Sequence, residues 1–252
     1  TNATKTKHLW ILRHGQATHN PRAEAARDNG CSHEEFMELM RQDDSLDSQL
    51  TPLGQEQAKT VYEKHCKTLQ NDIELLVSSP LSRAIQTADL SVPLVPKRVV
   101  VEEFREINGW LLNAQRRTRT ALEQSFQSWN FEHIHEDEDT LWTPELESQE
   151  ACRERGYQGL CWILQQPEEK IFLVCHGGIL RFTMTQHELV KLEDGRDSGG
   201  LDRPPKPVEA RFENCELRRY EIAWEEQASV DTSGIDGSIR RILVLKEVDH
   251  EE

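Results

Sequence analysis

The chain has 252 residues, of which 36% are hydrophobic and 30% charged, a balance typical of a folded globular protein. Its net charge of −15 argues against nucleic acid or an anionic membrane as a partner, and no apolar run is long enough to cross a bilayer. The six cysteines form no Cys-x-x-Cys pair and the polar start lacks a signal-peptide core, so we expect reduced thiols and a cytoplasmic location.

The first predicted element ends in a histidine. Residues 9–12 are apolar and predict a short buried strand, which Arg13-His14-Gly15 follow at a turn. The same construction returns when the apolar residues 171–175 lead into His176. Because ligands of open α/β sheets bind at the carboxyl edge of the strands, the two imidazoles are expected side by side there. Either half alone is more often a turn with an incidental histidine.

Two segments follow the first turn. Residues 21–48 hold a short amphipathic stretch among charged residues, which predicts an insertion over one end of the sheet, either a lid or plain surface packing. In the second segment, Thr51 is placed to cap a helix whose first position is Pro52, and apolar residues recur at helical spacing as far as Leu69. We interpret this helix as structural.

An arginine follows the next predicted strand, residues 73–77. Ser79 is expected to cap a helix with Pro80 at its first position, so that Arg83 falls in the first turn. A cation in a first turn opposes the helix dipole unless an anion compensates it, and a guanidinium fits phosphate oxygens. Arg83 is therefore a candidate anion ligand.

Three carboxylates follow the third predicted strand, residues 99–101. Glu102, Glu103 and Glu106 all stand near its carboxyl end, and one of them is a candidate partner for the two histidines. Spacing alone does not choose among the three.

Two charged clusters come next. Arg116, Arg117 and Arg119 form the densest basic cluster, either a solvated helix face or a site whose role is open. Residues 132–139 hold two histidines at i and i+2 among acids, with no third ligand at a metal-site offset. We interpret that segment as a hydrated surface loop and expect no metal site.

The rest of the chain alternates helices and strands. Helices are predicted over residues 146–164 and 179–190, strands over 214–222 and 241–248, a mobile Gly/Pro-rich loop over 194–207 and a loose hairpin connection over 231–238. With no repeat and no clear boundary, this pattern predicts a single three-layer α/β/α domain over residues 1–252.

Five ordered motifs resemble the histidine phosphatase (phosphoglycerate mutase-like) superfamily. They are Leu-Arg-His-Gly-Gln-Ala-Thr-His-Asn at 12–20, Leu-Thr-Pro-Leu-Gly at 50–54, Ser-Ser-Pro-Leu-Ser-Arg-Ala at 78–84, Arg-Glu-Ile-Asn-Gly at 105–109 and Val-Cys-His-Gly-Gly at 174–178. Two further pieces, at 136–142 and 212–218, look like the phosphoglycerate mutase-like proteins of plants and fungi. The resemblance implies a three-layer α/β/α sandwich with a mostly parallel central sheet and insertions at about 21–48 and 103–145 over the active-site end.

The resemblance also implies a role for each site residue. His14 is expected to be the nucleophile that becomes phosphohistidine, and Glu106 the proton donor. Phosphoryl oxygens are expected to be held by Arg13, Asn20, Arg83, His176 and the backbone N–H of Gly177. Two arginines and an imidazolium supply the positive charge that phosphoryl transfer needs, so we expect neither a metal nor a cofactor.

One departure from the family pattern bears on the reaction. Mutases of the superfamily carry a Trp-containing segment after the Arg-His-Gly, whereas residues 21–48 stand there in this chain. The first hypothesis is therefore a phosphatase of small phosphate monoesters and the second a phosphoglycerate mutase. The third is a catalytically idle module that binds phosphorylated ligands. The expected partner is a small phosphorylated substrate, with neither nucleic acid nor membrane, and the oligomeric state is open.

Overall fold

The computed structural model describes residues 6–42, 45–194, 212–228 and 239–248. Its elements, in chain order, are β1 (Lys7–Arg13), α1 (Asn20–Asp28), α2 (His33–Arg41), α3 (Pro52–Val61), a π-helical turn (Tyr62–Cys66), α4 (Lys67–Leu69), β2 (Leu75–Ser78), α5 (Ser82–Ser91), β3 (Arg98–Val100), two 3-10 turns (Glu102–Phe104 and Leu112–Ala114), α6 (Arg119–Ser125), α7 (Gln149–Gln165), β4 (Lys170–Cys175), α8 (Gly177–Gln186), β5 (Val190–Asp194), β6 (Leu217–Ala228) and β7 (Ile239–Val248).

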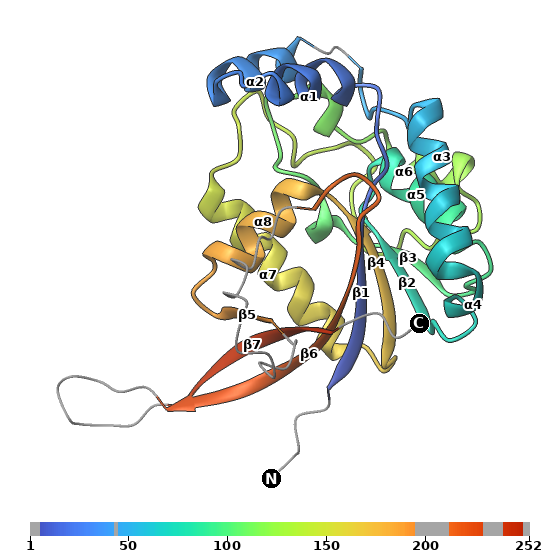
Figure 1. Ribbon diagram of the computed structural model, residues 1–252, viewed down its shortest axis with the longest axis vertical. Helices are drawn as coiled ribbons and strands as arrows, with labels where there is room; N and C mark the ends of the chain where they lie inside the picture. Colours follow the sequence, from blue (N-terminus) through green and yellow to red (C-terminus); the bar gives the residue numbers. More distant parts are fainter. Residues whose placement is uncertain (1–5, 43–44, 195–211, 229–238, 249–252) are drawn as a thin grey trace, which may run out of the picture.

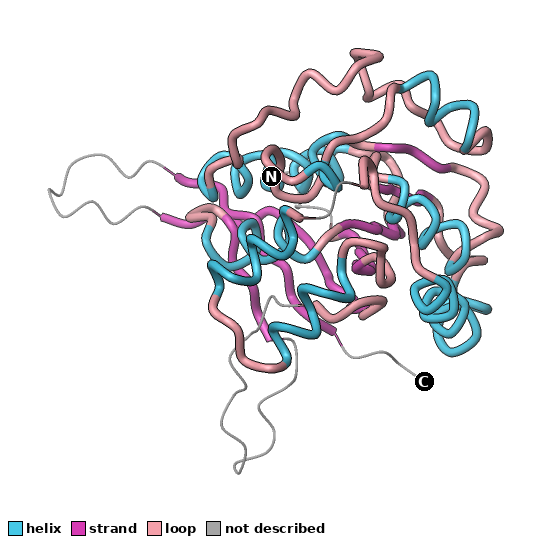
Figure 2. The backbone as a smooth tube through the Cα atoms, turned by 90° about the horizontal axis from the view of Figure 1, so that it is seen from above, coloured by secondary structure: helices cyan, strands magenta, loops and turns pink. Residues whose placement is uncertain are grey.

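The strands form one mostly parallel sheet, as predicted. Its order is β3-β2-β4-β1-β6-β7-β5. The pairs β3–β2, β2–β4, β4–β1 and β5–β7 are parallel, whereas β6 is antiparallel to both of its neighbours. The connections from β1 to β2, from β2 to β3, from β3 to β4 and from β4 to β5 each contain helices, and these helices lie against both faces of the sheet (Figures 1 and 2).

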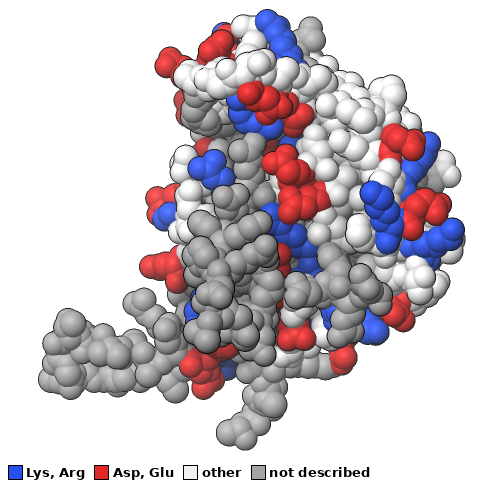
Figure 3. Space-filling model, in the orientation of Figure 1, with Lys and Arg blue, Asp and Glu red and all other residues white. Residues whose placement is uncertain are grey.

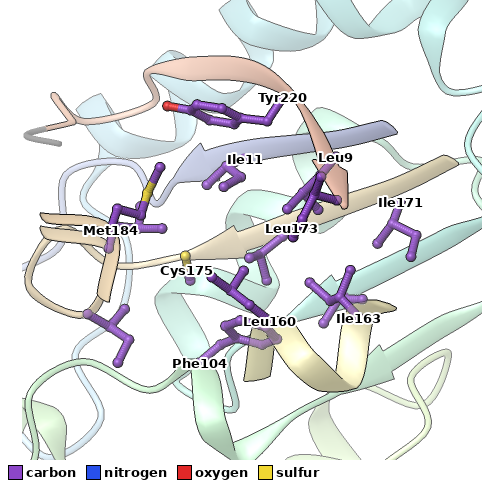
Figure 4. Packing of buried hydrophobic residues seen from close by; sticks show 14 of the residues in the cluster. Leu9, Ile11, Phe104, Leu160, Ile163, Ile171, Leu173, Cys175, Met184 and Tyr220 are labelled. Carbon is purple, nitrogen blue, oxygen red and sulfur yellow. The ribbon is translucent and has the colours of Figure 1, made fainter. Parts of the chain in front are cut away.

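Alternating side chains of the central strands build two hydrophobic cores. On one face Leu9 and Ile11 of β1 pack with α7 and α8, and Figure 4 shows them in the same cluster as Leu160 of α7. On the other face Trp10 and Leu12 pack with α3 and α5. This two-residue period gives the three layers that the sequence predicts.

The topology brings three chain turns to one edge of the sheet. Because β4 lies between β1 and β2 and all three are parallel, their carboxyl ends are neighbours. The turn after β1 begins with His14, the turn after β4 with His176, and the turn after β2 leads to Arg83. Helices α1 and α2, within the predicted insertion 21–48, lie over this edge (Figure 1). That the whole chain is one domain stays a prediction.

Several element boundaries differ from the predicted ones. Thr51 caps α3 with Pro52 at its first position, as expected. The Ser79 cap is wrong, because α5 begins only at Ser82 with Leu81 as its N-cap residue. The helix predicted over 179–190 ends at Gln186, and the chain then forms the unpredicted β5, whose apolar residues are too few to show a period.

The interpretation of the arginine cluster as a solvated helix face is wrong. Only Arg119 lies on α6, where it pairs with Glu123. Arg116 is 4% exposed and donates to Glu102 and to four backbone carbonyls. Arg117 pairs with the fully buried carboxylate of Asp47. The cluster holds loops together, so these arginines are structural ligands of the protein's own oxygens.

The acidic stretch 132–139 is not wholly a hydrated loop either. Ile134 is fully buried in the core, and the buried carboxylate of Asp139 makes a bidentate pair with Arg105. Glu102 accepts from the same guanidinium and is therefore not a surface acid. An ion pair between distant segments leaves no periodic signal in the sequence. Buried carboxylates such as Asp139 and Glu102 therefore cannot be told from solvent-exposed ones by the sequence pattern.

Residues 195–207 of the predicted Gly/Pro-rich loop and the connection at 231–238 lie outside the described residues. In the part of the chain that the structure describes, no helix is both long and apolar enough to span a membrane. All six cysteines are free thiols. Acidic and basic side chains are interspersed on the face seen in Figure 3, so no basic surface suited to a polyanion extends across it.

Candidate active site

His14 presents one defined nitrogen to the site. Its ring is buried, and its Nδ1 lies 2.7 Å from the carbonyl oxygen of Gly15. Because a carbonyl only accepts, Nδ1 carries the proton and Nε2 keeps its lone pair. Burial, followed by the charges of Arg83 and Arg13, lowers the pKa of His14 well below its ordinary value. The ring is therefore neutral at pH 7, with Nε2 as a nucleophilic nitrogen.

His176 stands beside that ring. The two ring centroids are 4.9 Å apart, and the His176 side chain is fully buried between the ends of β4 and α8. Its Nε2 lies 2.7 Å from the hydroxyl of Ser79. The two imidazoles expected at the sheet edge are thus brought together. Ser79, expected to be a helix cap, contacts a site histidine instead.

Arg83 reaches His14 directly. Its Nε is 3.4 Å from His14 Nε2, and its Nη1 donates to the backbone carbonyl of Asn113 at 2.7 Å. Burial lowers the pKa of Arg83 to about 10, opposed by the charges of Glu106 and Asp47, so it remains a cation at pH 7. The guanidinium lies at the nucleophilic nitrogen, where a phosphoryl group bound to His14 would need positive charge.

Arg13 supplies the second guanidinium. Its Nη1 donates to the carbonyl of Phe212 at 2.8 Å, and its Nη2 lies 3.4 Å from a carboxylate oxygen of Glu24 on α1. A methyl group on Gly177 would stand 3.4 Å from Arg13 Nε, which places the start of α8 against this arginine. Arg13 and Gly177, both predicted phosphate ligands, are therefore neighbours, and Glu24 is an acid that the sequence did not single out.

Asn20 is buried at the start of α1, close to the site. Its Oδ1 accepts from the backbone N–H of Ala17 at 2.9 Å, and its Nδ2 lies 3.2 Å from Nε2 of His19. Both polar atoms of this predicted phosphate ligand thus have partners within the protein. The imidazole of His19, whose ring centroid is 6.3 Å from that of His14, is a site residue that the sequence reasoning missed.

Glu106 lies at the N-terminus of α8. Its Oε1 accepts from the backbone N–H groups of Ile107 and Ile179, at 2.9 and 3.0 Å, and its Oε2 from that of Gly178, at 3.1 Å. A methyl group on Gly178 would come within 2.2 Å of Glu106 Oε1, so the second glycine of Cys-His-Gly-Gly lets the carboxylate approach. Of the three acids that spacing left open, Glu106 is the one at the site.

Another glycine pair, Gly15 and Gly54, fixes the turn that carries His14. A methyl group on Gly15 would come within 2.5 Å of the Gly54 carbonyl, and one on Gly54 within 2.0 Å of the Gln16 carbonyl. The N–H of Thr51 donates to that Gln16 carbonyl at 2.9 Å. The Leu-Thr-Pro-Leu-Gly segment thus packs directly against the turn that carries His14, which agrees with our interpretation of it as structural.

Several buried side-chain nitrogens at the site have no hydrogen-bond partner among the described residues. They are Arg13 Nε, His19 Nδ1, Asn113 Nδ2 and one nitrogen of His176, its Nδ1. Buried polar groups are normally hydrogen-bonded, so this cluster of atoms suits an oxygen-rich anion. No group of three metal-ligating side chains occurs in the described part of the chain.

A family model for the histidine phosphatase superfamily (branch 1) matches residues 9–201. The chain belongs to the histidine phosphatase superfamily. The match spans His14, Arg83, Glu106 and His176, the residues that the fold brings to one edge of the sheet.

Relatives of this chain carry mutase-like names. Phosphoglycerate mutase-like protein 1 of Arabidopsis thaliana is 28% identical over 263 residues, which cover 92% of this chain and 86% of the relative. Phosphomutase-like protein 3 of Candida albicans is 30% identical over 188 residues, which cover 71% of this chain and 59% of the relative.

A solved structure from Escherichia coli, provisionally assigned as an alpha-ribazole-5'-P phosphatase, superimposes with a TM-score of 0.50 at 18% identity. The superposition covers 94% of this chain and 96% of that one, and it shows a shared fold. Membership of the histidine phosphatase superfamily supports a phosphoryl-transfer enzyme.

Proposed function

We propose that this histidine phosphatase hydrolyses small phosphate monoesters through a phosphohistidine formed on His14. The observation that carries the proposal is the fixed tautomer of His14: Nδ1–H is held by the Gly15 carbonyl while Nε2 faces the Arg83 guanidinium. A neutral, oriented imidazole is a nucleophile near pH 7, and a covalent intermediate divides one difficult displacement into two easier ones.

In the first half-reaction, the lone pair of His14 Nε2 forms a bond to phosphorus. The bond from phosphorus to the leaving alkoxide oxygen breaks, and that oxygen takes a proton from Glu106. Arg13, Arg83 and His176 bind the equatorial phosphoryl oxygens, so that positioning and charge lower the barrier without a metal.

In the second half-reaction, water attacks the phosphohistidine. The Glu106 carboxylate takes the water's proton as the new phosphorus–oxygen bond forms. The phosphorus–nitrogen bond then breaks, and its electron pair returns to His14 Nε2, which releases inorganic phosphate. The three backbone N–H groups at Glu106 support this step, because they hold the side chain in one position at the start of α8.

Glu24 favours hydrolysis over the mutase reaction. Its carboxylate lies 3.4 Å from Arg13 Nη2, and Asn214 Nδ2 also donates to it, at 3.3 Å. A phosphoglycerate carries a carboxylate near its phosphate, and negative charge beside a phosphate-binding arginine opposes such a ligand. A monoester without a second anionic group meets less repulsion. The insertion 21–48, which carries Glu24, also replaces the Trp-containing segment of mutases.

The proposed partner is accordingly a small phosphorylated metabolite, and the proposal includes neither nucleic acid nor a membrane. The six free thiols fit the proposed cytoplasmic location, since a reducing compartment keeps cysteines unpaired.

The test is a quench of the enzyme during turnover of ³²P-labelled p-nitrophenyl phosphate in the presence of EDTA. Wild-type protein should carry acid-labile, base-stable label and release inorganic phosphate, because no metal takes part. His14→Ala should carry no label, whereas the control His8→Ala, altered at the other end of β1, should label normally. Label that persists in His14→Ala would remove this histidine from the mechanism.

The same preparations separate the alternatives. Interconversion of 2- and 3-phosphoglycerate without net phosphate release would identify a mutase. Binding of phosphorylated ligands without any turnover would identify the catalytically idle module.

A further inference from the structure

The imidazole of His19 takes no part in the reaction described above. It is 5% exposed, precedes the first residue of α1, and lies with its ring centroid 6.3 Å from that of His14. Burial, followed by the charges of Arg83 and Arg13, lowers the pKa of His19 well below its ordinary value. His19 is thus a neutral imidazole in the field of the two arginines expected to bind phosphate.

Neighbouring groups fix which nitrogen of His19 carries the proton. The backbone N–H of Ala17 donates to Asn20 Oδ1, so the other end of that amide is the donor, Nδ2. Asn20 Nδ2 lies 3.2 Å from His19 Nε2, which must therefore accept. A neutral imidazole whose Nε2 accepts carries its proton on Nδ1.

The Nδ1–H of His19 is consequently a buried donor, and it has no acceptor among the described residues. Leaving a buried N–H unpaired is unfavourable, and such groups in native proteins commonly await a ligand or an ordered water. The nearby Arg13 Nε and Asn113 Nδ2 are buried and unpartnered as well. A cluster of donors without acceptors is complementary to a group with several acceptors and negative charge.

We propose that His19 is an additional phosphate-binding residue, whose Nδ1–H donates to an oxygen of the phosphoryl group held at His14. Asn20 then acts as a positioning residue that fixes the His19 tautomer, in place of the direct contact with phosphate expected from the family pattern. The inference rests on the proposed function, since it needs a phosphoryl ligand at His14.

The test measures binding of orthovanadate, a phosphate mimic, by isothermal titration. His19→Phe keeps the ring volume but removes the donor, so the dissociation constant should rise roughly 10- to 100-fold, the effect of losing one hydrogen bond to a charged group. His19→Asn places an amide nitrogen where Nδ1 stands, so its dissociation constant for orthovanadate should be much closer to that of the wild type. His8→Phe, outside the site, is the matched control and should leave binding unchanged.

The outcomes distinguish the two proposals. Wild-type affinity in His19→Phe, with phosphate release intact in the wild type, would overturn the role of His19 and leave the proposed function standing. Absence of orthovanadate binding by the wild type would overturn both.

A second measurement does not depend on the Phe variant folding. Two-bond ¹H–¹⁵N spectra of the wild-type histidines report the tautomer of each ring, and His19→Asn assigns the His19 signals by their loss. The Nδ1–H tautomer, with its proton protected from exchange and shifted on addition of orthovanadate, would support the proposal. An Nε2–H tautomer, or a signal that orthovanadate leaves unchanged, would contradict it.

Discussion

A backbone carbonyl decides which nitrogen of His14 can react. The Asn20 amide exerts the same control at His19 Nε2, while the Ser79 hydroxyl, which can donate or accept, fixes the orientation of the His176 ring. Each partner is a near neighbour in space supplied by a turn at the carboxyl edge of the sheet. Tautomer control is therefore a property of the fold, which orients the three imidazoles before any ligand arrives.

The proposed role of Glu106 as proton donor predicts that the rate depends on the leaving group. An alkyl alcohol needs a proton in the transition state, whereas nitrophenolate departs almost unaided. Glu106→Gln should lose about a hundred- to ten-thousand-fold in single-turnover phosphorylation by an alkyl phosphate, and much less with p-nitrophenyl phosphate. Single turnover isolates this step from the water attack, which should also slow. Equal losses on both substrates would mean that Glu106 orients or binds the substrate and donates no proton.

Glu103→Gln is the matched control for that experiment and should change neither substrate much. Glu102→Gln is not a control, because Glu102 accepts from the buried guanidiniums of Arg105 and Arg116. Loss of the Glu102 carboxylate would leave the buried charges of Arg105 and Arg116 with one negative partner fewer and would destabilise the loop that leads to Glu106.

Single residues show where prediction from the sequence ends. His14, Arg83 and His176 were predictable because each follows a recognisable strand on one parallel sheet. Ser79 and His19 were not identified, because their contacts depend on turn geometry that has no sequence period. Spacing alone also left Glu106 among three acids; the family resemblance selected it, and the structure places its carboxylate at the start of α8.

At the scale of elements, α7 fixes the loop that carries Glu106. Arg155 on α7 donates to the backbone carbonyls of Glu103 and Arg105, both at 2.9 Å, and of Glu106, at 3.1 Å. The guanidinium also makes a bidentate pair with Glu147, at 2.9 and 2.6 Å. The planar guanidinium of Arg155 thus joins α7, the loop that carries Glu106 and the segment before α7.

Arg155→Lys should therefore impair the same step as Glu106→Gln. Lysine keeps the charge but cannot reach three carbonyls and a carboxylate at once, so Glu106 should lose its alignment. Turnover of an alkyl phosphate should fall more than that of p-nitrophenyl phosphate, while orthovanadate affinity stays near wild type. The control is Arg153→Gln on the same helix, whose pair with Glu150 is 3.9 Å long and exposed. An equal loss on both substrates would assign Arg155 a general structural role.

Elements were predictable where the apolar period was long and both ends carried signals, as for α3 with its Thr51 cap. The start of α5 was not predictable, because the Ser79 side chain contacts His176 and does not cap the helix. A residue distant in sequence takes its place: the N–H of Ser82 donates to Asp47 at 2.8 Å. Helix-capping rules failed at the start of α5, because a residue of the candidate site occupies the position expected for the cap.

Across the whole molecule, two buried arginines, Arg13 and Arg83, gather at the site within a chain of net charge −15. They lie with three neutral imidazoles and with the carboxylates of Glu24 and Glu106, which offset their charge. Neutral histidines limit the repulsion that a wholly cationic cluster would cause in the absence of ligand. Burial is thus the cause of both the nucleophilicity of His14 and the cost of protonating it.

That cost predicts how stability depends on pH. The pKa values of His14, His19 and His176 are lowered well below 6.5, first by burial and then by the charge of Arg83. Between their folded and unfolded pKa values the unfolded chain binds more protons, so stability is complete above pH 6.5 and is lost as pH falls below it. Each ring contributes up to about 1.4 kcal/mol per pH unit. The urea midpoint should therefore fall between pH 6.5 and 5.5 and change little between 7.5 and 6.5.

The buried carboxylate of Asp139 does not obscure this window. Although burial opposes it, pairing with Arg105 lowers the pKa of Asp139, so its contribution is lost only below about pH 4. His19→Asn removes one of the three rings, and its midpoint should fall less steeply than that of the wild type. Saturating inorganic phosphate should reduce the slope further, because an anion among the rings raises their pKa values toward those of the unfolded chain. A midpoint that is flat from pH 7.5 to 5.5 would mean that the rings accept protons without penalty, and that burial does not hold His14 neutral.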